Sequence, residues 1–178
     1  MFFRRCLAIT QGYDGFDVFL FVMFTYEYGH TCPGPNQRRV LISYLDSVNY
    51  VSPKKYRTLI FKEVITAYLA NVKERGFHTA HIWSSPPAKG DNYIFNVHPA
   101  TQRIPGTARL LEWYMSILNA SKERGIVERT TNLYDEYWPA DEVDRTRDLR
   151  ILPYLKGDFW IEKAQQLIQV NPTPSRRL

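Results

Sequence analysis

The sequence contains few of the residues on which several protein classes depend. It has 178 residues but only two cysteines, Cys6 and Cys32, too few and too scattered for a secreted disulfide framework or a thiolate zinc site. Its longest apolar stretch, residues 18–24, is far shorter than the roughly 20 residues that span a bilayer as a helix. The first ten residues place two arginines inside what would be the apolar region of a signal peptide. We therefore expect a soluble, intracellular protein without a membrane partner.

The nine glycines form none of the common nucleotide-binding or hydrolase motifs. No Gly-x-Gly-x-x-Gly, Walker loop or Gly-x-Ser-x-Gly elbow occurs. No metal site is expected, because His78 and His81 lie three residues apart on a predicted strand and would point to opposite faces. The net charge is +5, but basic residues occur only as short, separate pairs. Direct nucleic-acid binding is therefore not expected.

Strand-like and helix-like segments alternate, and this pattern predicts an α/β layer fold. The predicted strands are residues 16–25, 39–45, 77–84 and 93–98, and the predicted helices are residues 59–72, 109–124 and 161–170. Gly76 is placed to end the first helix. With 44% hydrophobic residues the chain can bury one core, so we expect a single domain over residues 1–170 and a disordered tail at 171–178.

The end of one predicted strand and the start of the next predicted helix together indicate a place for an anionic ligand. Residues 43–47 end a predicted strand, and Arg57 and Thr58 lie in the first turns of the helix that follows. Free backbone N–H groups and the helix dipole favour anions at such a place. Many α/β helices begin with a basic residue, so the pattern also fits an ordinary helix start. Trp83 and the adjacent Trp113 and Tyr114 also have an ordinary explanation, because aromatic residues at such positions are commonly part of a core.

Seven short runs, taken in order, resemble those of one enzyme family. They are residues 35–40, 42–48, 81–83, 93–95, 112–114, 152–154 and 157–160. In their order and nearly in their spacing they resemble the catalytic domain of the CREB-binding-protein family of nuclear histone and protein lysine acetyltransferases. The similarity covers about residues 2–168. It implies a central mixed β-sheet flanked by helices, with acetyl-CoA as cosubstrate and no metal.

The resemblance also implies which residues act. Tyr114 would be the general acid that protonates the leaving thiolate, since a tyrosine hydroxyl stays protonated at neutral pH. Trp83 would line the tunnel that receives the substrate lysine. The family's contacts with acetyl-CoA carry over onto eight positions: Leu45, Asp46, Ser47, Arg57, Thr58, Ile104, Arg109 and Trp113. Of these, Arg57 and Arg109 can form charge-assisted hydrogen bonds with the phosphates of coenzyme A.

The chain departs from the family pattern in three side chains and in extent. It has Phe61 for a tyrosine, Ser85 for a cysteine and Lys156 for an acid that helps make the substrate groove electronegative. Relatives have further catalytic-domain residues on both sides of the matched region, so we expect a partial domain, truncated at both ends.

Two functions stay open. One is a nuclear lysine acetyltransferase that regulates transcription, with histone tails, other lysine-containing proteins and transcription factors as partners. The other is a truncated, non-catalytic paralogue that binds coenzyme A or transcriptional partners.

Overall fold

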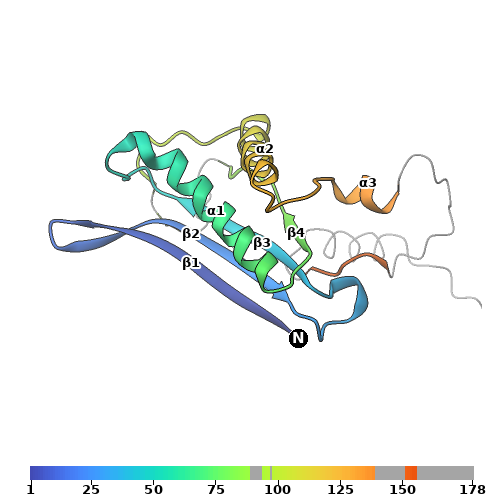
Figure 1. Cartoon of the computed structure of the whole chain (residues 1–178). Helices are drawn as coiled ribbons and strands as arrows, with labels where there is room; N and C mark the ends of the chain where they lie inside the picture. The colour runs from blue at the N-terminus through green and yellow to red at the C-terminus, as the bar shows by residue number, and fades with distance from the viewer. Residues whose placement is uncertain (89–93, 97, 139–150, 156–178) are drawn as a thin grey trace, which may run out of the picture.

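A mixed sheet of four strands forms the centre of the computed structural model, which describes residues 1–88, 94–96, 98–138 and 151–155. The strands are β1 (Phe2–Tyr13), β2 (Phe16–Tyr28), β3 (Arg39–Ser47) and β4 (Thr79–Ile82), and the α-helices are α1 (Arg57–Glu74), α2 (Thr107–Glu123) and α3 (Leu133–Tyr137). The first three strands are antiparallel neighbours, whereas β4 runs parallel to β3 (Figure 1). The predicted α/β fold with a central mixed sheet and flanking helices is confirmed.

A two-residue turn joins β1 to β2. Asp14 and Gly15 both have positive φ, 46° and 86°, between the paired residues Tyr13 and Phe16. A turn with positive φ at both central residues matches the right-handed twist of the flanking strands, and Asp-Gly is one of its preferred sequences. No strand is predicted from the sequence before residue 16, so β1 is an addition to the predicted sheet.

Most predicted elements are confirmed with shifted ends. The strands predicted at 16–25 and 39–45 and the helices predicted at 59–72 and 109–124 correspond to β2, β3, α1 and α2, while β4 is shorter than the predicted 77–84. Gly76, at φ 85°, follows α1, and its N–H donates to the carbonyl of Lys73 at 2.9 Å. The helix predicted at 161–170 and the tail at 171–178 lie outside the described residues.

The strand predicted at 93–98 is wrong for the part that the structure describes. Residues 94–96 and residue 98 form no strand. The N–H groups of Ile94 and Phe95 donate instead to a carboxylate oxygen of Asp46, at 3.1 and 3.0 Å. A side-chain acceptor thus takes donors that a neighbouring strand would otherwise use.

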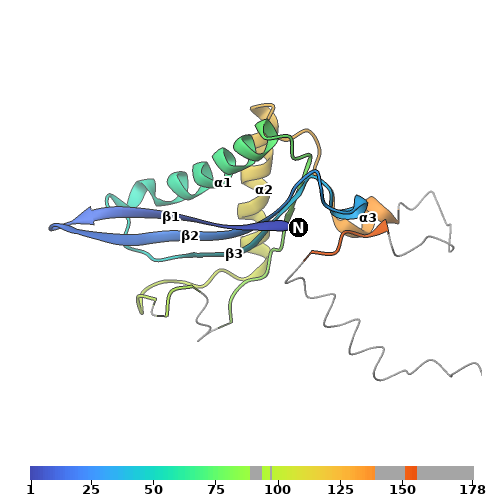
Figure 2. The same ribbon diagram turned by 90° about the horizontal axis from the view of Figure 1, so that it is seen from below.

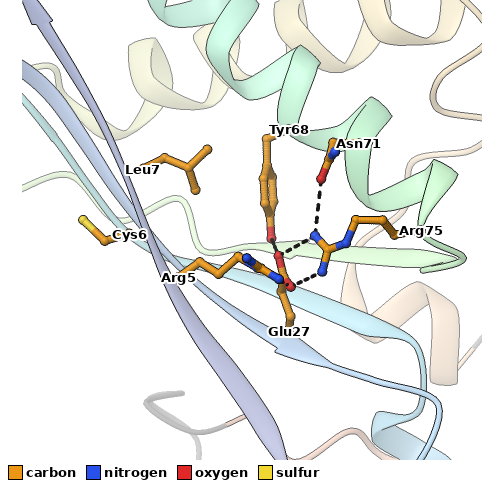
Figure 3. Close-up of a pocket in the computed structure, with 7 residues that line it drawn as sticks. All are labelled: Arg5, Cys6, Leu7, Glu27, Tyr68, Asn71 and Arg75. Carbon is orange, nitrogen blue, oxygen red and sulfur yellow. Dashed lines mark hydrogen bonds and ion pairs between the residues drawn. The ribbon is translucent and has the colours of Figure 1, made fainter.

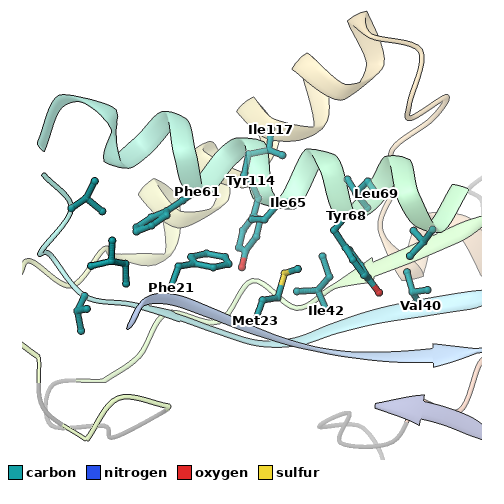
Figure 4. Packing of buried hydrophobic residues seen from close by; sticks show 14 residues of the cluster. Phe21, Met23, Val40, Ile42, Phe61, Ile65, Tyr68, Leu69, Tyr114 and Ile117 are labelled. Carbon is teal, nitrogen blue, oxygen red and sulfur yellow. The ribbon is translucent and has the colours of Figure 1, made fainter. Parts of the chain in front are cut away.

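The core lies between the sheet and the two long helices. α1 runs nearly along the strands, whereas α2 runs across them (Figure 2). Most of the buried residues of this cluster come from β2, β3, α1 and α2. They include Phe21, Met23, Val40, Ile42, Phe61, Ile65, Tyr68, Leu69, Tyr114 and Ile117 (Figure 4). A hydrogen bond also connects the two helices, since the hydroxyl of Ser121 donates to that of Thr66 at 3.4 Å. Within the described residues, no helix has the length and apolar character needed to cross a bilayer.

Candidate active site

The end of β3 and the start of α1 meet, as the sequence pattern predicts. Ser47 is the last residue of β3 and Arg57 the first of α1. The Nη2 atom of Arg57 donates to the hydroxyl of Ser47 at 3.3 Å. This contact confirms the predicted proximity of a strand end and a helix start.

The guanidinium of Arg57 is partly buried and lacks an acidic partner among the described residues. Besides Ser47, it contacts the ring of Phe61, with 5.5 Å from Cζ to the ring centroid. Its Nε atom is buried and has no hydrogen-bond partner in the described part of the chain. Burial lowers the pKa of Arg57, yet a guanidinium remains protonated at neutral pH. A partly buried cation with an unused donor fits an anionic ligand.

The first turns of α1 and α2 are also suited to anions. Neither helix has a side-chain cap at its N-terminus, and neither has an acidic residue in its first turn. Arg57 begins α1, and Arg109 lies in the first turn of α2, where its side chain is exposed. Uncapped backbone N–H groups and the positive end of the helix dipole attract negative charge. Both predicted phosphate-binding arginines therefore stand at electropositive helix ends.

Asp46 attaches the following loop to the end of β3. One carboxylate oxygen accepts hydrogen bonds from the Ser47 N–H and from Nε2 of His98, both at 2.8 Å. The other oxygen accepts the N–H groups of Ile94 and Phe95 described above. The carboxylate is thus occupied by protein donors, and its visible role is to position this loop. A contact between Asp46 and the cofactor stays a prediction.

Gln102 makes a second connection between this loop and β3. Its Nε2 atom donates to the carbonyl of Ser47 at 2.8 Å. Its Oε1 atom is buried and has no hydrogen-bond partner among the described residues. Two buried polar atoms without a partner, on Arg57 and Gln102, thus belong to side chains that both contact Ser47. These are groups that a polar ligand could satisfy.

Tyr114 is a core residue of α2. Its side chain is 7% exposed and points from α2 toward the sheet (Figure 4). Burial raises the pKa of Tyr114 to about 12. The ring of Trp113 lies against it, edge to face, with 5.0 Å between the centroids. The hydroxyl is therefore protonated at neutral pH, as a proton donor must be.

The remaining predicted residues lie on four segments. Leu45 is partly buried near the end of β3, and Thr58 is exposed in the first turn of α1. Trp83 directly follows β4 and is 42% exposed, and Ile104 is exposed in the segment that leads into α2. Direct contacts connect Ser47 with Arg57 and Trp113 with Tyr114. The roles of all these residues stay predictions.

Sequence reasoning assigns no role to His98 and Gln102, which the structure connects to the site. They contact Asp46 and Ser47 across 52 and 55 residues of chain. No local spacing could have indicated pairs so distant in sequence. Lys156 and the run at 157–160 lie outside the described residues. Among the residues that are described, no group of three or more His, Cys, Asp or Glu could hold a metal ion.

Comparisons with known proteins identify the family. A family model described as "Histone acetyltransferase domain KAT3" matches residues 3–171. Histone acetyltransferase HAC2 of Arabidopsis thaliana is 38% identical over 172 residues, which cover 93% of this chain and 12% of that protein. Probable histone acetyltransferase HAC-like 2 of Oryza sativa subsp. japonica is 40% identical over 172 residues, covering 92% of this chain and 12% of that protein.

An animal protein is similar as well. Protein cbp-1 of Caenorhabditis elegans is 41% identical over 156 residues, which cover 88% of this chain and 8% of that protein. The chain thus spans a small part of the length of the curated relatives it matches, between 8% and 14%. These matches confirm the resemblance to the CREB-binding-protein family. The chain belongs to the KAT3 family of histone acetyltransferases.

Proposed function

We propose that this chain transfers the acetyl group of acetyl-CoA to lysine side chains of histones and other proteins, in the nucleus and in the service of transcription. The names of the relatives support the histone acetyltransferase class. The observation that carries the proposal is the partly buried guanidinium of Arg57, which has an unused Nε donor and no acidic partner among the described residues. It lies at an uncapped helix start, beside the hydroxyl of Ser47.

Coenzyme A suits this place because it is a polyanion. Arg57 and Arg109 supply guanidinium donors for its phosphates, and charge-assisted hydrogen bonds of this kind are roughly twice as strong as neutral ones. Ser47 and Thr58 add neutral hydroxyl donors at the same helix start. The buried Oε1 of Gln102 can accept a hydrogen bond from an amide of the same ligand. The residues present therefore fit the cosubstrate.

The reaction needs a proton donor and an apolar wall. When a lysine amine attacks the thioester, a thiolate leaves and takes up a proton. In this proposal Tyr114, whose hydroxyl is protonated at neutral pH, supplies that proton and is reprotonated by the proton that the attacking amine loses as the amide forms. Trp83 provides an apolar surface that orients the substrate lysine and, by desolvation, lowers its pKa toward the reactive neutral amine.

One observation favours the second function, which is binding without catalysis. The Tyr114 side chain is 7% exposed and is packed in the core cluster. Only a small part of this side chain is open to a reactant. A chain that binds coenzyme A or transcriptional partners without turnover would need no access to Tyr114.

Isothermal titration with coenzyme A tests the cofactor site. We expect the parent chain to bind, and Arg57→Ala to weaken binding by about tenfold because it removes a charge-assisted contact. Arg109→Lys should weaken it less, since lysine keeps the charge and loses only the fork geometry. Lys122→Ala, a control in the last turn of α2, removes the same charge and should change little.

Two results would count against the proposal. The absence of any binding at millimolar coenzyme A would exclude the cofactor site, and equal losses for Arg57→Ala and Lys122→Ala would show that only net charge matters. Turnover is measured separately, by mass spectrometry of histone peptides incubated with acetyl-CoA. Binding without acetylation would select the second function.

A further inference from the structure

Two acidic residues are buried among those that the structure describes, and their partners differ. Glu27 accepts hydrogen bonds from Arg5 of β1, from Tyr68 of α1 and from Arg75 just beyond α1 (Figure 3). Burial alone would raise the pKa of Glu27, but the hydrogen bonds and charges of Arg75 and Arg5 outweigh it and hold the pKa below its ordinary value. These contacts join elements of the fold. Asp46 instead lies next to Ser47, and its carboxylate binds the segment that leads from β4 to α2.

The carboxylate of Asp46 receives four donors, and only one of them is a side chain. Its two oxygens accept the N–H groups of Ser47, Ile94 and Phe95 and the Nε2 atom of His98, at 2.8 to 3.1 Å. Two donors at each oxygen use about all of the lone pairs that a carboxylate offers. Because both oxygens accept, the proton of this last hydrogen bond belongs to Nε2 of His98. His98 is therefore the side chain through which the segment is attached to Asp46.

His98 stands at one end of a short turn, and Gln102 stands at the other. The N–H of Gln102 donates to the carbonyl of Pro99, the residue after His98, at 2.8 Å. The turn is bound to the last two residues of β3, since His98 binds Asp46 and Nε2 of Gln102 donates to the carbonyl of Ser47, each at 2.8 Å. A change in the position of His98 is thus transmitted to Gln102 through four residues of chain.

The ring of His98 is held from a second side. It lies edge to face against the ring of Phe95, with 6.2 Å between the centroids and 82° between the planes. Phe95 in turn packs against the main core cluster. The His98 side chain is only 24% exposed. The core and the carboxylate of Asp46 together fix the orientation of this imidazole.

The far end of the turn carries a group of the candidate active site. The Oε1 atom of Gln102 is buried and lacks a hydrogen-bond partner within the described part of the chain, as does Nε of Arg57. Both side chains contact Ser47. The place of the Oε1 acceptor relative to the Arg57 donor therefore depends on how the turn is held.

We propose that His98 is a positioning residue for coenzyme A binding and that it acts through Gln102. The inference rests on the proposed function. By holding the turn on Asp46, His98 keeps Oε1 of Gln102 beside Ser47 and Arg57, so that the ligand meets an acceptor already in place. A preorganised site costs less free energy to order when the ligand binds. His98 itself touches no ligand in this arrangement.

Isothermal titration of the full chain with coenzyme A tests the inference. His98→Phe keeps a flat ring and removes the donor, and we expect the Kd to rise about tenfold. His98→Gln should stay within about threefold of the parent chain, because Nε2 of glutamine can donate to the same carboxylate. His78→Phe is the matched control: it makes the same change at an exposed histidine whose ring contacts Thr79, and it should leave the Kd unchanged.

The stoichiometry of the titration separates positioning from a merely structural role. A variant that only destabilises the fold lowers the fraction of competent protein and leaves the Kd of the rest unchanged. Loss of positioning raises the Kd at unchanged stoichiometry. His98→Asn, whose shorter side chain does not reach Asp46, is a second variant with the same expected tenfold rise. It keeps the test decisive if His98→Phe does not fold.

A double substitution tests whether His98 acts through Gln102. We expect Gln102→Leu alone to raise the Kd about tenfold, because the ligand loses its acceptor. His98→Phe added to Gln102→Leu should raise it little further, since the contact that His98 positions is already gone. Independent effects would instead multiply to about a hundredfold.

Four results would overturn the inference while the parent chain still binds coenzyme A. They are an unchanged Kd for His98→Phe and His98→Asn, no restoration by His98→Gln, reduced stoichiometry with an unchanged Kd, and a hundredfold rise in the double variant. If the parent chain itself does not bind, the proposed function and the inference fail together. The titration of the parent chain therefore distinguishes the two failures.

Discussion

At the scale of single residues, two buried tyrosines differ in their surroundings. Burial raises the pKa of both Tyr68 and Tyr114 to about 12. The hydroxyl of Tyr68 donates to Glu27, whereas no described hydrogen bond holds that of Tyr114. The hydroxyl of Tyr114 is therefore the one that is free to donate its proton elsewhere.

This difference leads to a prediction for Tyr114→Phe. The substitution keeps the ring and removes only the proton, so we expect a transfer rate about 100-fold lower with nearly unchanged affinity for coenzyme A. Tyr68→Phe is the matched control and should leave the rate unchanged. Single-turnover acetyl transfer measures both variants. An unaltered rate for Tyr114→Phe would remove this residue from the mechanism.

The sequence predicts the place of a single residue correctly where its position relative to a strand and a helix is enough to locate it. Arg57 follows a predicted strand and loop at the start of a helix, and the structure places it against Ser47. The sequence does not predict the hydrogen-bond partners of Asp46. Its carboxylate holds the loop through His98 and two backbone N–H groups. Nothing in the local sequence specifies those partners, because they depend on how the chain folds back.

At the scale of elements, α2 has one face in the core and another in solvent. Ile117 is 1% exposed, whereas Leu111, on the same helix, is 52% exposed. The side chain of Ile117 packs with residues of α1 and the sheet in the main core cluster. This asymmetry fixes how α2 is turned and therefore where Trp113 and Tyr114 lie.

Removing the buried side chain should cost far more than removing the exposed one. We expect Ile117→Ala to lower the free energy of unfolding by about 2–5 kcal/mol, through lost burial and the cavity it leaves. Leu111→Ala should change it by less than about 0.5 kcal/mol. Chemical denaturation followed by circular dichroism measures both. Similar losses would mean that α2 does not pack through this face.

Two elements illustrate the limits of sequence patterns. β1 was not predicted, although Asp14 and Gly15 are a strong hairpin signal between two segments of strand-forming residues. Arginines and polar residues interrupt its apolar pattern because most of its side chains are exposed. The opposite error occurred at residues 93–98, where an apolar and aromatic run suggested a strand. There the carboxylate of Asp46 binds backbone donors that a strand would require.

At the scale of the whole molecule, Glu27 joins three elements. It lies on β2 and binds Arg5 of β1 and Arg75 just beyond α1. Its pKa is lower in the folded chain than the ordinary value of 4.5, so its ionisation stabilises the fold. That stabilisation is complete above pH 4.5 and is lost as the pH falls through the folded pKa.

We therefore expect the free energy of unfolding to decrease as the pH falls below 4.5, and Glu27→Gln to reduce this dependence. At neutral pH the substitution should cost about 2–3 kcal/mol, because it leaves two guanidinium groups without their carboxylate. Glu63→Gln, which breaks the exposed pair with Arg124, should cost less than about 1 kcal/mol. Denaturation across a pH series provides the comparison. Equal costs would show that the Glu27 network does not stabilise the fold.

The sequence by itself determined the family, the α/β class and the order of most elements. These depend on features that are local in the chain: strand-forming runs, helical spacing, the glycine after α1 and short motifs in a fixed order. They can be read without knowing which distant residues meet.

Only the tertiary structure decided what surrounds each side chain. It placed β1 at the edge of the sheet, buried Tyr114 in the core and brought Gln102 to Ser47 across 55 residues. It also enclosed Glu27 between two arginines that are 22 and 48 residues away in the chain. Burial, hydrogen bonding and electrostatic environment all arise from such long-range contacts. No local pattern encodes them, because they exist only once the β3-α1-β4 crossover and the hairpin have packed together.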